Sequence, residues 1–238
     1  MRCIICYEKV ENFSSHFSEH AGVTAGEITE YFSELCKPYQ IEIGEVTATD
    51  LKAIRFSPEN ALILMAYARE IYNIGWQLCC RWLAEHEKSH IRLRKLYSPP
   101  PANPGVISCV EDYYIENFML SELPEFPEFR EICRVNAEMT LSIRRVAPMP
   151  DAVLLNAEMN ARHFLSLATW LALGVLDVSR LELRDFELAF VTRASEIMRE
   201  MKRLEHLRIC IMRINSLHQT FFRFFRYLFF RYLEDLYS

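Results

Sequence analysis

Residues 57–98 read SPENALILMAYAREIYNIGWQLCCRWLAEHEKSHIRLRKLYS, and this stretch decides the fold class. Ser57 followed by Pro58 is a typical helix start, because a serine side chain caps free backbone amides and proline is tolerated in the first turn. No further proline occurs until residue 99, and apolar residues cover nearly every face of the first half of the segment. A helix that is apolar all round is buried. The segment therefore predicts a long central helix that bends at Gly75.

The rest of the chain shows the same preference for helices. It has only 6 glycines in 238 residues, too few for the many corners of a β-sandwich or barrel. A capping box from Thr24 to Glu27 predicts a helix that ends before Pro38. Further helices are expected near 109–122, 128–145 and 152–174, whereas residues 39–55 stay unassigned. The last 64 residues contain neither proline nor glycine, which predicts one or two long helices.

A proline-rich stretch, SPPPANPG at residues 98–105, is the clearest linker in the chain. Because 51% of the residues are hydrophobic, the chain can bury one large core or two modest ones. The sequence therefore predicts an all-α protein with two helical lobes. Its expected parts are a small N-terminal module at 1–22, a lobe at 23–97, the linker at 98–105 and a lobe at 106–238.

The N-terminal module carries four side chains of the kinds that tetrahedral zinc prefers, thiolates and imidazoles. They are Cys3, Cys6, His16 and His20. The first residues show no apolar leader, so we expect an intracellular protein of the cytoplasm or nucleus. There cysteines stay reduced, and a Cys-x2-Cys pair indicates a metal site sooner than a disulfide. The pattern predicts Zn2+ as a cofactor.

Two apolar residues support this interpretation. Val10 follows the second cysteine by four positions and Phe13 precedes the first histidine by three. Residues 3–20 thus resemble a C2H2-type zinc finger, and the resemblance implies that Cys3, Cys6, His16 and His20 are the zinc ligands. The loop between Cys6 and His16 has nine residues where that family usually has about twelve. The exposed charges of the module are mostly acidic, which favours a protein partner over DNA.

A second motif, His86-Glu87-Lys88-Ser89-His90, has the H-E-x-x-H form. It resembles the motif of zincin-type zinc metalloproteases, which implies His86 and His90 as ligands and Glu87 as the group that polarises the metal-bound water.

Two observations weaken the protease interpretation. Both x positions are polar, and no strand is predicted upstream to bind a substrate. The surrounding run EHEKSHIRLRK instead indicates the solvent-exposed end of a helix. Glu111 is a candidate third ligand for the protease. A second structural zinc site that joins Cys79 or Cys80 to the two histidines is the remaining alternative, although adjacent helical residues point in different directions.

The C-terminal segment differs in charge from the rest of the chain. Between residues 191 and 231, nine Arg and Lys stand against three Glu, in a chain of net charge −5. Apolar residues recur at helical spacing, and FFRFFRYLFFRYL at 221–233 adds aromatics on the other faces. The apolar and aromatic faces of such a helix must be buried against the core of the protein, a second copy of the chain, a membrane interface or single-stranded nucleic acid. The candidate surface residues are Arg199, Lys202, Arg203, Arg208, Arg213, Phe221, Arg223, Phe224 and Arg226.

The functional prediction follows from these features and from the lack of other enzymatic motifs. The sequence has no glycine-rich phosphate loop, G-x-S-x-G elbow or Rossmann fingerprint. Arginines interrupt the one candidate membrane span, so no transmembrane segment is expected. The sequence predicts a non-enzymatic zinc-finger scaffold or assembly protein that binds protein partners and forms a homo-oligomer, with nucleic acid as an optional further component. The alternatives are a viral matrix-like or nucleocapsid-like structural protein that binds RNA or a membrane surface, and a metalloprotease that uses HEKSH.

Overall fold

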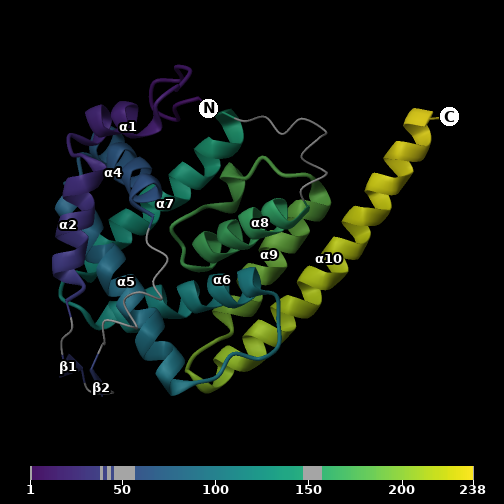
Figure 1. Ribbon diagram of the computed structural model, residues 1–238. Helices are drawn as coiled ribbons and strands as arrows, with labels where there is room; N and C mark the ends of the chain where they lie inside the picture. Colours follow the sequence, from purple (N-terminus) through teal and green to yellow (C-terminus); the bar gives the residue numbers. More distant parts are fainter. Residues whose placement is uncertain (1, 38–39, 42–43, 46–56, 147–156, 238) are drawn as a thin grey trace. The chain divides into compact units, whose positions relative to one another are not determined.

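The computed structural model describes residues 2–37, 40–41, 44–45, 57–146 and 157–237, which are mainly α-helical as predicted (Figure 1). The α-helices are α1 (Phe13–Ala21), α2 (Ala25–Leu35), α4 (Pro58–Tyr72), α5 (Trp76–Leu96), α6 (Pro104–Tyr114), α7 (Phe126–Val146), α8 (Ala157–Ala172), α9 (Asp185–Arg199) and α10 (Glu205–Tyr237). Shorter elements are the π-helix η1 (Ile115–Met119), the 3-10 helices η2 (Leu120–Glu122) and η4 (Val178–Arg180), and the antiparallel strands β1 (Gln40–Ile41) and β2 (Gly44–Glu45).

The chain forms two compact units that are not consecutive in sequence. The first contains Met1–Ser98 and Ile115–Ala147, and the second contains Pro99–Tyr114 and Pro148–Ser238. This division differs from the expected lobes at 23–97 and 106–238, because residues 115–147 return to the first unit. A linker shows where a chain leaves a packed unit, whereas only side-chain packing decides where it returns.

Helix α4 is the centre of the first unit. Leu62, Met65 and Ala66 are completely buried on it, as expected for a helix that is apolar on nearly every face. It packs against α1, α2, α5 and α7. The contact with α7 includes a 3.1 Å hydrogen bond between the hydroxyls of Tyr67 and Ser142, so α7 belongs to this core.

The predicted single helix over residues 57–98 is wrong, because the chain turns between α4 and α5. Asn73 adopts a left-handed conformation with φ of 53°, which asparagine tolerates better than most residues. Its amide donates to the Arg69 carbonyl at 3.1 Å, and the Ile74 amide donates to the Ala68 carbonyl at 3.0 Å. Gly75 is extended and begins α5 instead of bending a continuous helix.

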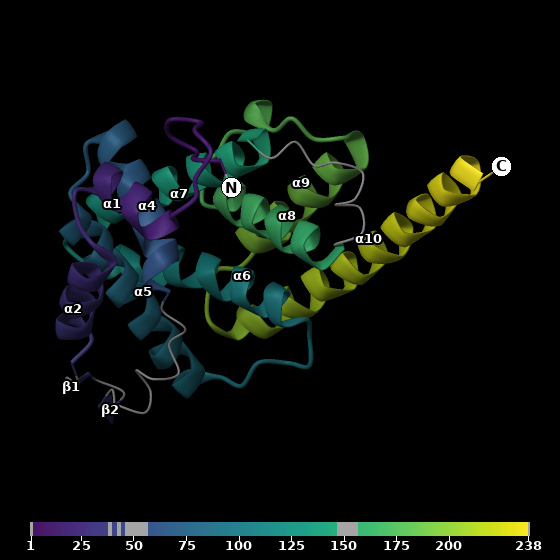
Figure 2. The same cartoon turned by 45° about the horizontal axis from the view of Figure 1, so that its top comes forward.

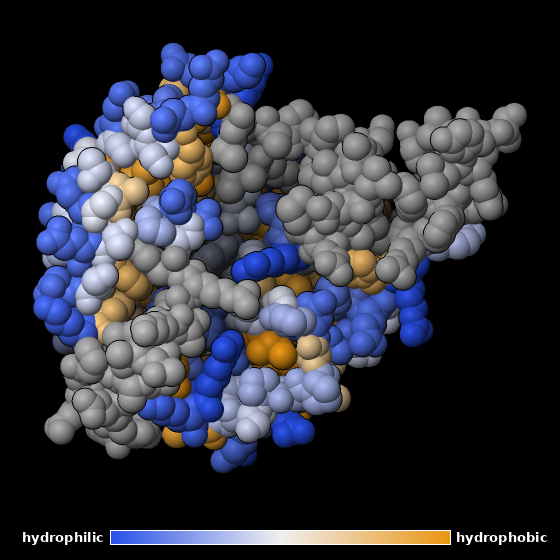
Figure 3. All heavy atoms as spheres, viewed as in Figure 1, coloured by the Kyte–Doolittle hydropathy of each residue, from blue (hydrophilic) through white to orange (hydrophobic). Residues whose placement is uncertain are grey.

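Helix α2 begins at the predicted capping box. The Thr24 hydroxyl oxygen accepts the Glu27 amide at 3.2 Å, and the Thr24 amide donates to the Glu27 carboxylate at 2.8 Å. Phe32 and Cys36 at its other end pack with Ala84 of α5. The outer surface over α1 and α2 is mostly hydrophilic, as expected for helices whose apolar residues face inward (Figure 3).

Helix α8 packs against α6, α9 and α10 in the second unit. The Thr169 hydroxyl of α8 donates to the Cys109 carbonyl of α6 at 3.1 Å. The described part of the last 64 residues contains two α-helices, α9 and α10, besides the short η4. The two α-helices separate at residues 200–204 although proline and glycine are absent there. An Arg213–Glu200 ion pair joins the start of α10 to the end of α9. The Asn103 amide donates to the Asn215 side chain at 2.9 Å, which ties the proline-rich stretch to α10.

The capping box gives a prediction about the stability of α2. Thr24→Ala removes the side-chain acceptor of an amide that has no other helical partner, so it is expected to lower the free energy of unfolding by about 1 kcal/mol. Urea unfolding followed by circular dichroism measures this loss. Thr29→Ala is the matched control, because Thr29 is exposed in the middle of α2 and only bonds back to the Ala25 carbonyl. Equal losses in both variants would contradict the role of the cap.

Candidate metal centre

Residues 2–9 form a tight turn that brings the two N-terminal cysteines to one side. Arg2 and Lys9 pair as an antiparallel bridge, and the Cys3 amide donates to the Glu8 carbonyl at 2.9 Å. The turn closes at Tyr7, whose φ of 63° is left-handed. The Ile5 amide donates to the Cys3 sulfur at 3.3 Å, so the backbone itself offers a hydrogen bond to this sulfur.

Helix α1 supplies the two imidazoles. The Asn12 side chain caps it by accepting the Ser15 amide at 3.0 Å. His16 and His20 are four residues apart, and residues at this spacing share one face of a helix. Their ring centroids are 4.8 Å apart. The short loop after Cys6 thus starts the helix early enough to leave both histidines facing the cysteine turn.

The four side chains converge as the sequence predicted. The Cys3 sulfur is 3.8 Å from Nε2 of His20, and the Cys6 sulfur is 3.4 Å from Nε2 of His16. One ligating atom from each of the four residues lies within 4.8 Å of all the others. Such a group can bind a metal ion.

Burial acts on the Cys3 thiol. It raises the pKa of Cys3, whereas backbone hydrogen bonds from Cys6 and Ile5 act in the lowering direction. A thiol must lose its proton to become a metal ligand. A cation bound between the two cysteines would replace that proton and remove the cost of a partly buried thiolate.

The cluster is built into the first unit, because α1 packs against α4 in both views (Figures 1 and 2). Phe17 of α1 is buried. Gly22 caps the helix with φ of 65°, and a Cβ there would lie 1.4 Å from a guanidinium nitrogen of Arg69. Behind the cluster, Nδ1 of His20 lies 3.9 Å from the Glu70 carboxylate of α4. Sequence reasoning missed Glu70, since nothing near residue 70 indicates that α1 docks there.

The two histidines of the HEKSH motif also meet. On α5 the Nε2 atoms of His86 and His90 are 3.2 Å apart, and Nδ1 of His86 lies 2.6 Å from the Glu116 carboxylate of η1. The expectation that this run is a solvent-exposed helix end is wrong, since Lys88 and Ser89 are buried. The physical reason is that α5 is covered by α2, α7 and η1, while the Lys88 ammonium pairs with Glu85 at 3.1 Å.

Other residues considered with this motif lie elsewhere. Glu87 is half-buried, and Glu111 is buried on α6 in the second unit. Cys79 and Cys80 are buried near the start of α5, and within the described part of the chain neither joins a group of ligating atoms. Sequence reasoning missed Glu116. Its one local signal is a single carboxylate inside the apolar run YYIENFML.

The residues predicted as a partner surface divide between core and solvent. Arg199 donates to the Leu171 and Ala172 carbonyls at the end of α8, and Arg213 pairs with Glu200. Phe221 is buried against Phe164 and Phe190, so it belongs to the core of the second unit instead. Arg199 and Arg213 are nevertheless exposed, as are Lys202, Arg203, Arg208, Arg223 and Phe224, whereas the Arg226 side chain lies outside the described residues.

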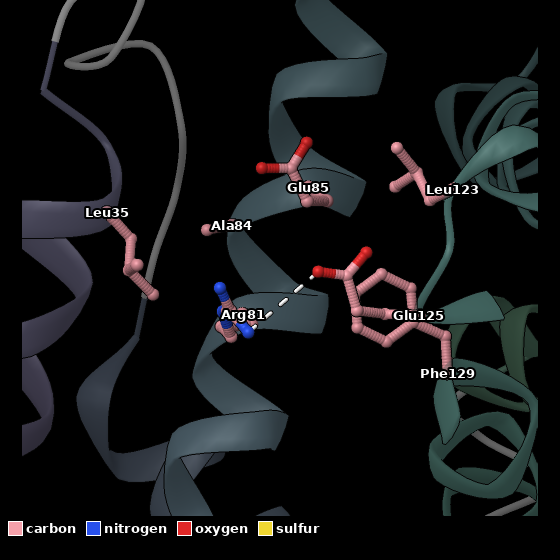
Figure 4. Close-up of a pocket in the computed structure, with 7 residues that line it drawn as sticks. All are labelled: Leu35, Arg81, Ala84, Glu85, Leu123, Glu125 and Phe129. Atoms are coloured by element: carbon pink, nitrogen blue, oxygen red, sulfur yellow. Dashed lines mark ion pairs between the residues drawn. The ribbon is translucent and has the colours of Figure 1, made fainter. Parts of the chain in front are cut away.

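A small cavity in the first unit lies between α2, α5 and the segment that leads into α7 (Figure 4). Its volume is about 240 Å³, below the roughly 300–1,000 Å³ of typical ligand sites. An Arg81–Glu125 ion pair of 3.8 Å crosses its lining. The two side-chain clusters therefore carry the candidate chemistry, and this cavity does not.

Comparisons with known proteins give no information on the site. No family model, curated protein or solved structure matches the chain. Among helices of the described residues, none has both the length and the apolar character needed to cross a membrane.

The position of Glu70 predicts an effect on metal affinity. A carboxylate behind a histidine ligand orients the ring and increases its basicity, and losing such a group typically weakens binding about 10- to 100-fold. Because Glu70 is 3.9 Å away, Glu70→Gln is expected near the lower end of that range in a chelator-competition assay. Glu19→Gln removes the same charge from an exposed site beside His20 and should leave the affinity unchanged. An equal loss of metal affinity in both variants would mean that Glu70 acts only through its charge, and not through its contact with His20.

Proposed function

We propose that the chain is a zinc-stabilised binding protein that acts through protein–protein contacts, and the convergence of Cys3, Cys6, His16 and His20 carries this proposal. In tetrahedral zinc sites Zn–S is about 2.3 Å and Zn–N about 2.0–2.1 Å, which separates sulfur from nitrogen by about 3.6 Å. The two sulfur–nitrogen distances in the cluster, 3.4 and 3.8 Å, lie on either side of that value.

The number of ligands favours a structural zinc over a catalytic one. Catalytic zinc keeps one coordination position open for water or substrate, whereas four protein ligands close the site. The order of bridge, cysteine turn and helix also supports the resemblance to a C2H2-type finger. Here zinc would hold the turn on α1 while Phe17 anchors α1 to α4.

The charges of the module favour a protein partner. Glu8, Glu11 and Glu19 are exposed around the cluster, and phosphate backbones are bound by positive side chains. A module whose ordered elements are joined by a metal can present an acidic surface to a basic or polar partner. The proposed role is therefore docking, without a chemical step.

Metal content tests the zinc proposal. Cys3→Ser is expected to lower the zinc bound per chain by one, and to remove the thiolate-to-cobalt charge-transfer absorption when Co2+ replaces zinc. Cys36→Ser is the matched control, because Cys36 is a buried cysteine of the same unit outside the cluster. Mass spectrometry of the metal and absorption spectra measure both effects. A parent chain without charge-transfer absorption would overturn the zinc finger.

Exposed apolar side chains on α10 favour self-association as a second role. Ile209, Met212, Phe224 and Tyr227 are each about half exposed, and their spacing places them along one side of the helix. The opposite side holds the buried residues Leu207, Ile211, Ile214 and Phe221. Helix α10 also continues past the ends of α8 and α9 (Figures 1 and 2). We propose that a second copy of the chain covers this side.

Mass in solution tests the self-association. Replacing Ile209 and Met212 together by Glu should convert the assembly into single chains, because like charges would face each other across the contact. Val178→Glu is the control, since Val178 is an exposed apolar residue of the same unit outside α10. Sedimentation velocity measures the change. A parent protein that sediments as a single chain would remove this role and leave the zinc proposal intact.

A further inference from the structure

We infer that His86 and His90 form a second metal site, for a divalent transition ion such as Zn2+, with Glu116 as its positioning residue. The inference does not depend on the N-terminal cluster. It differs from the protease interpretation, because it assigns a role to a carboxylate outside the HEKSH motif and none to Glu87. All three side chains lie in the first unit, on α5 and η1.

The distance between the two imidazoles fits joint coordination. Two nitrogen ligands of a tetrahedral zinc are separated by about 3.3 Å when each Zn–N bond is 2.0–2.1 Å. The Nε2 atoms of His86 and His90 are 3.2 Å apart. The spacing of four residues on α5 holds both rings on one face, and their centroids are 4.9 Å apart. A metal bound by this pair keeps two further coordination positions for other ligands.

Glu116 fixes which nitrogen of His86 is available. A carboxylate accepts hydrogen bonds, so Nδ1 of His86 carries the proton and donates to Glu116 at 2.6 Å. The Nε2 lone pair is then the one that faces His90. Metal-ligating histidines usually have this arrangement, in which a carboxylate behind the ring sets both its tautomer and its orientation.

The carboxylate of Glu116 is itself held from two other helices. It is fully buried, and it accepts the Trp82 indole N–H at 3.0 Å and the Cys133 thiol at 3.0 Å. Burial raises the pKa of Cys133 well above its usual range, so this thiol keeps its proton and donates it. Both donors are neutral. Positive charge at the His86–His90 pair therefore stabilises the buried Glu116 carboxylate. A divalent ion brings more positive charge there than a proton does.

The backbone at Glu116 supports a functional role. Ile115–Met119 is a π-helix that follows α6 directly. Such widened turns are rare, and they occur frequently at functional sites. Here the widened turn carries the carboxylate that contacts His86. The alternative arrangement, in which the two histidines share a proton without a metal, uses the same contacts and is separated by experiment.

Cobalt titration of the full-length chain tests the inference without a variant. A site without sulfur adds d–d absorption but no thiolate charge transfer, so the two sites have different spectra. The second site is supported by an equivalent of Co2+ that binds without charge-transfer absorption, whether or not the N-terminal site fills. Saturation without any such equivalent would overturn it and leave the shared proton as the explanation of the short contact.

Variants then assign the residues. In the Cys3→Ser chain, His90→Ala should abolish the remaining Co2+ binding, whereas His206→Ala, on α10, should not change it. Glu116→Gln is expected to weaken affinity about 10- to 100-fold, while Cys133→Ser, which keeps a donor to the carboxylate, should stay within about threefold of the parent. An unchanged Co2+ affinity in Glu116→Gln with a retained helical spectrum would refute the positioning role.

Discussion

The first unit depends on the turn of the chain at Asn73–Gly75. The residues before and after it form α4 and α5, both of which carry several buried apolar side chains, and one straight helix could not bury all of that surface in a small unit. The left-handed Asn73 ends α4 and lets α5 start in a new direction. As a result α4 packs against α1, both helices pack against α2 and α7, and α5 also packs against η1. Both candidate metal sites rest on these two helices.

The two sites share one physical design. In each, two histidines lie four residues apart on a helix, and a carboxylate from a different element lies near Nδ1 of one ring. The Nε2 atoms face the two cysteine sulfurs in the N-terminal cluster, and they face each other in the pair on α5. Glu70 has this place behind His20, and Glu116 has it behind His86. The difference is in burial. Glu116 is fully buried and has further donors, whereas Glu70 is partly exposed and farther from its ring.

The second unit shows how a long amphipathic helix can serve two surfaces. Phe221 and the apolar residues before it complete the core with α8 and α9, while Ile209 and Met212 remain exposed on the other side. The basic residues are exposed on both sides of this division, but they differ in their contacts. Arg199 and Arg213 are exposed and also bond to groups of the same unit, and Lys202 and Arg208 are exposed as well. A count of basic residues along the sequence does not distinguish these roles. The residue type is the same whether an arginine side chain bonds to backbone carbonyls or only to water.

The sequence by itself determined the helical class, the cap of α2, the start of α4 and the convergence of the N-terminal ligands. These are local properties, set by residues within about twenty positions of one another. Only the tertiary structure decided that α4 and α5 separate at Asn73, that Ile115–Ala147 returns to the first unit and that Lys88 is buried. The positions of Glu70 beside His20 and of Glu116 beside His86 are likewise known only from the tertiary structure. The physical reason is that such contacts depend on which helices pack together, and no residue near Glu70 or Glu116 in the chain carries that information.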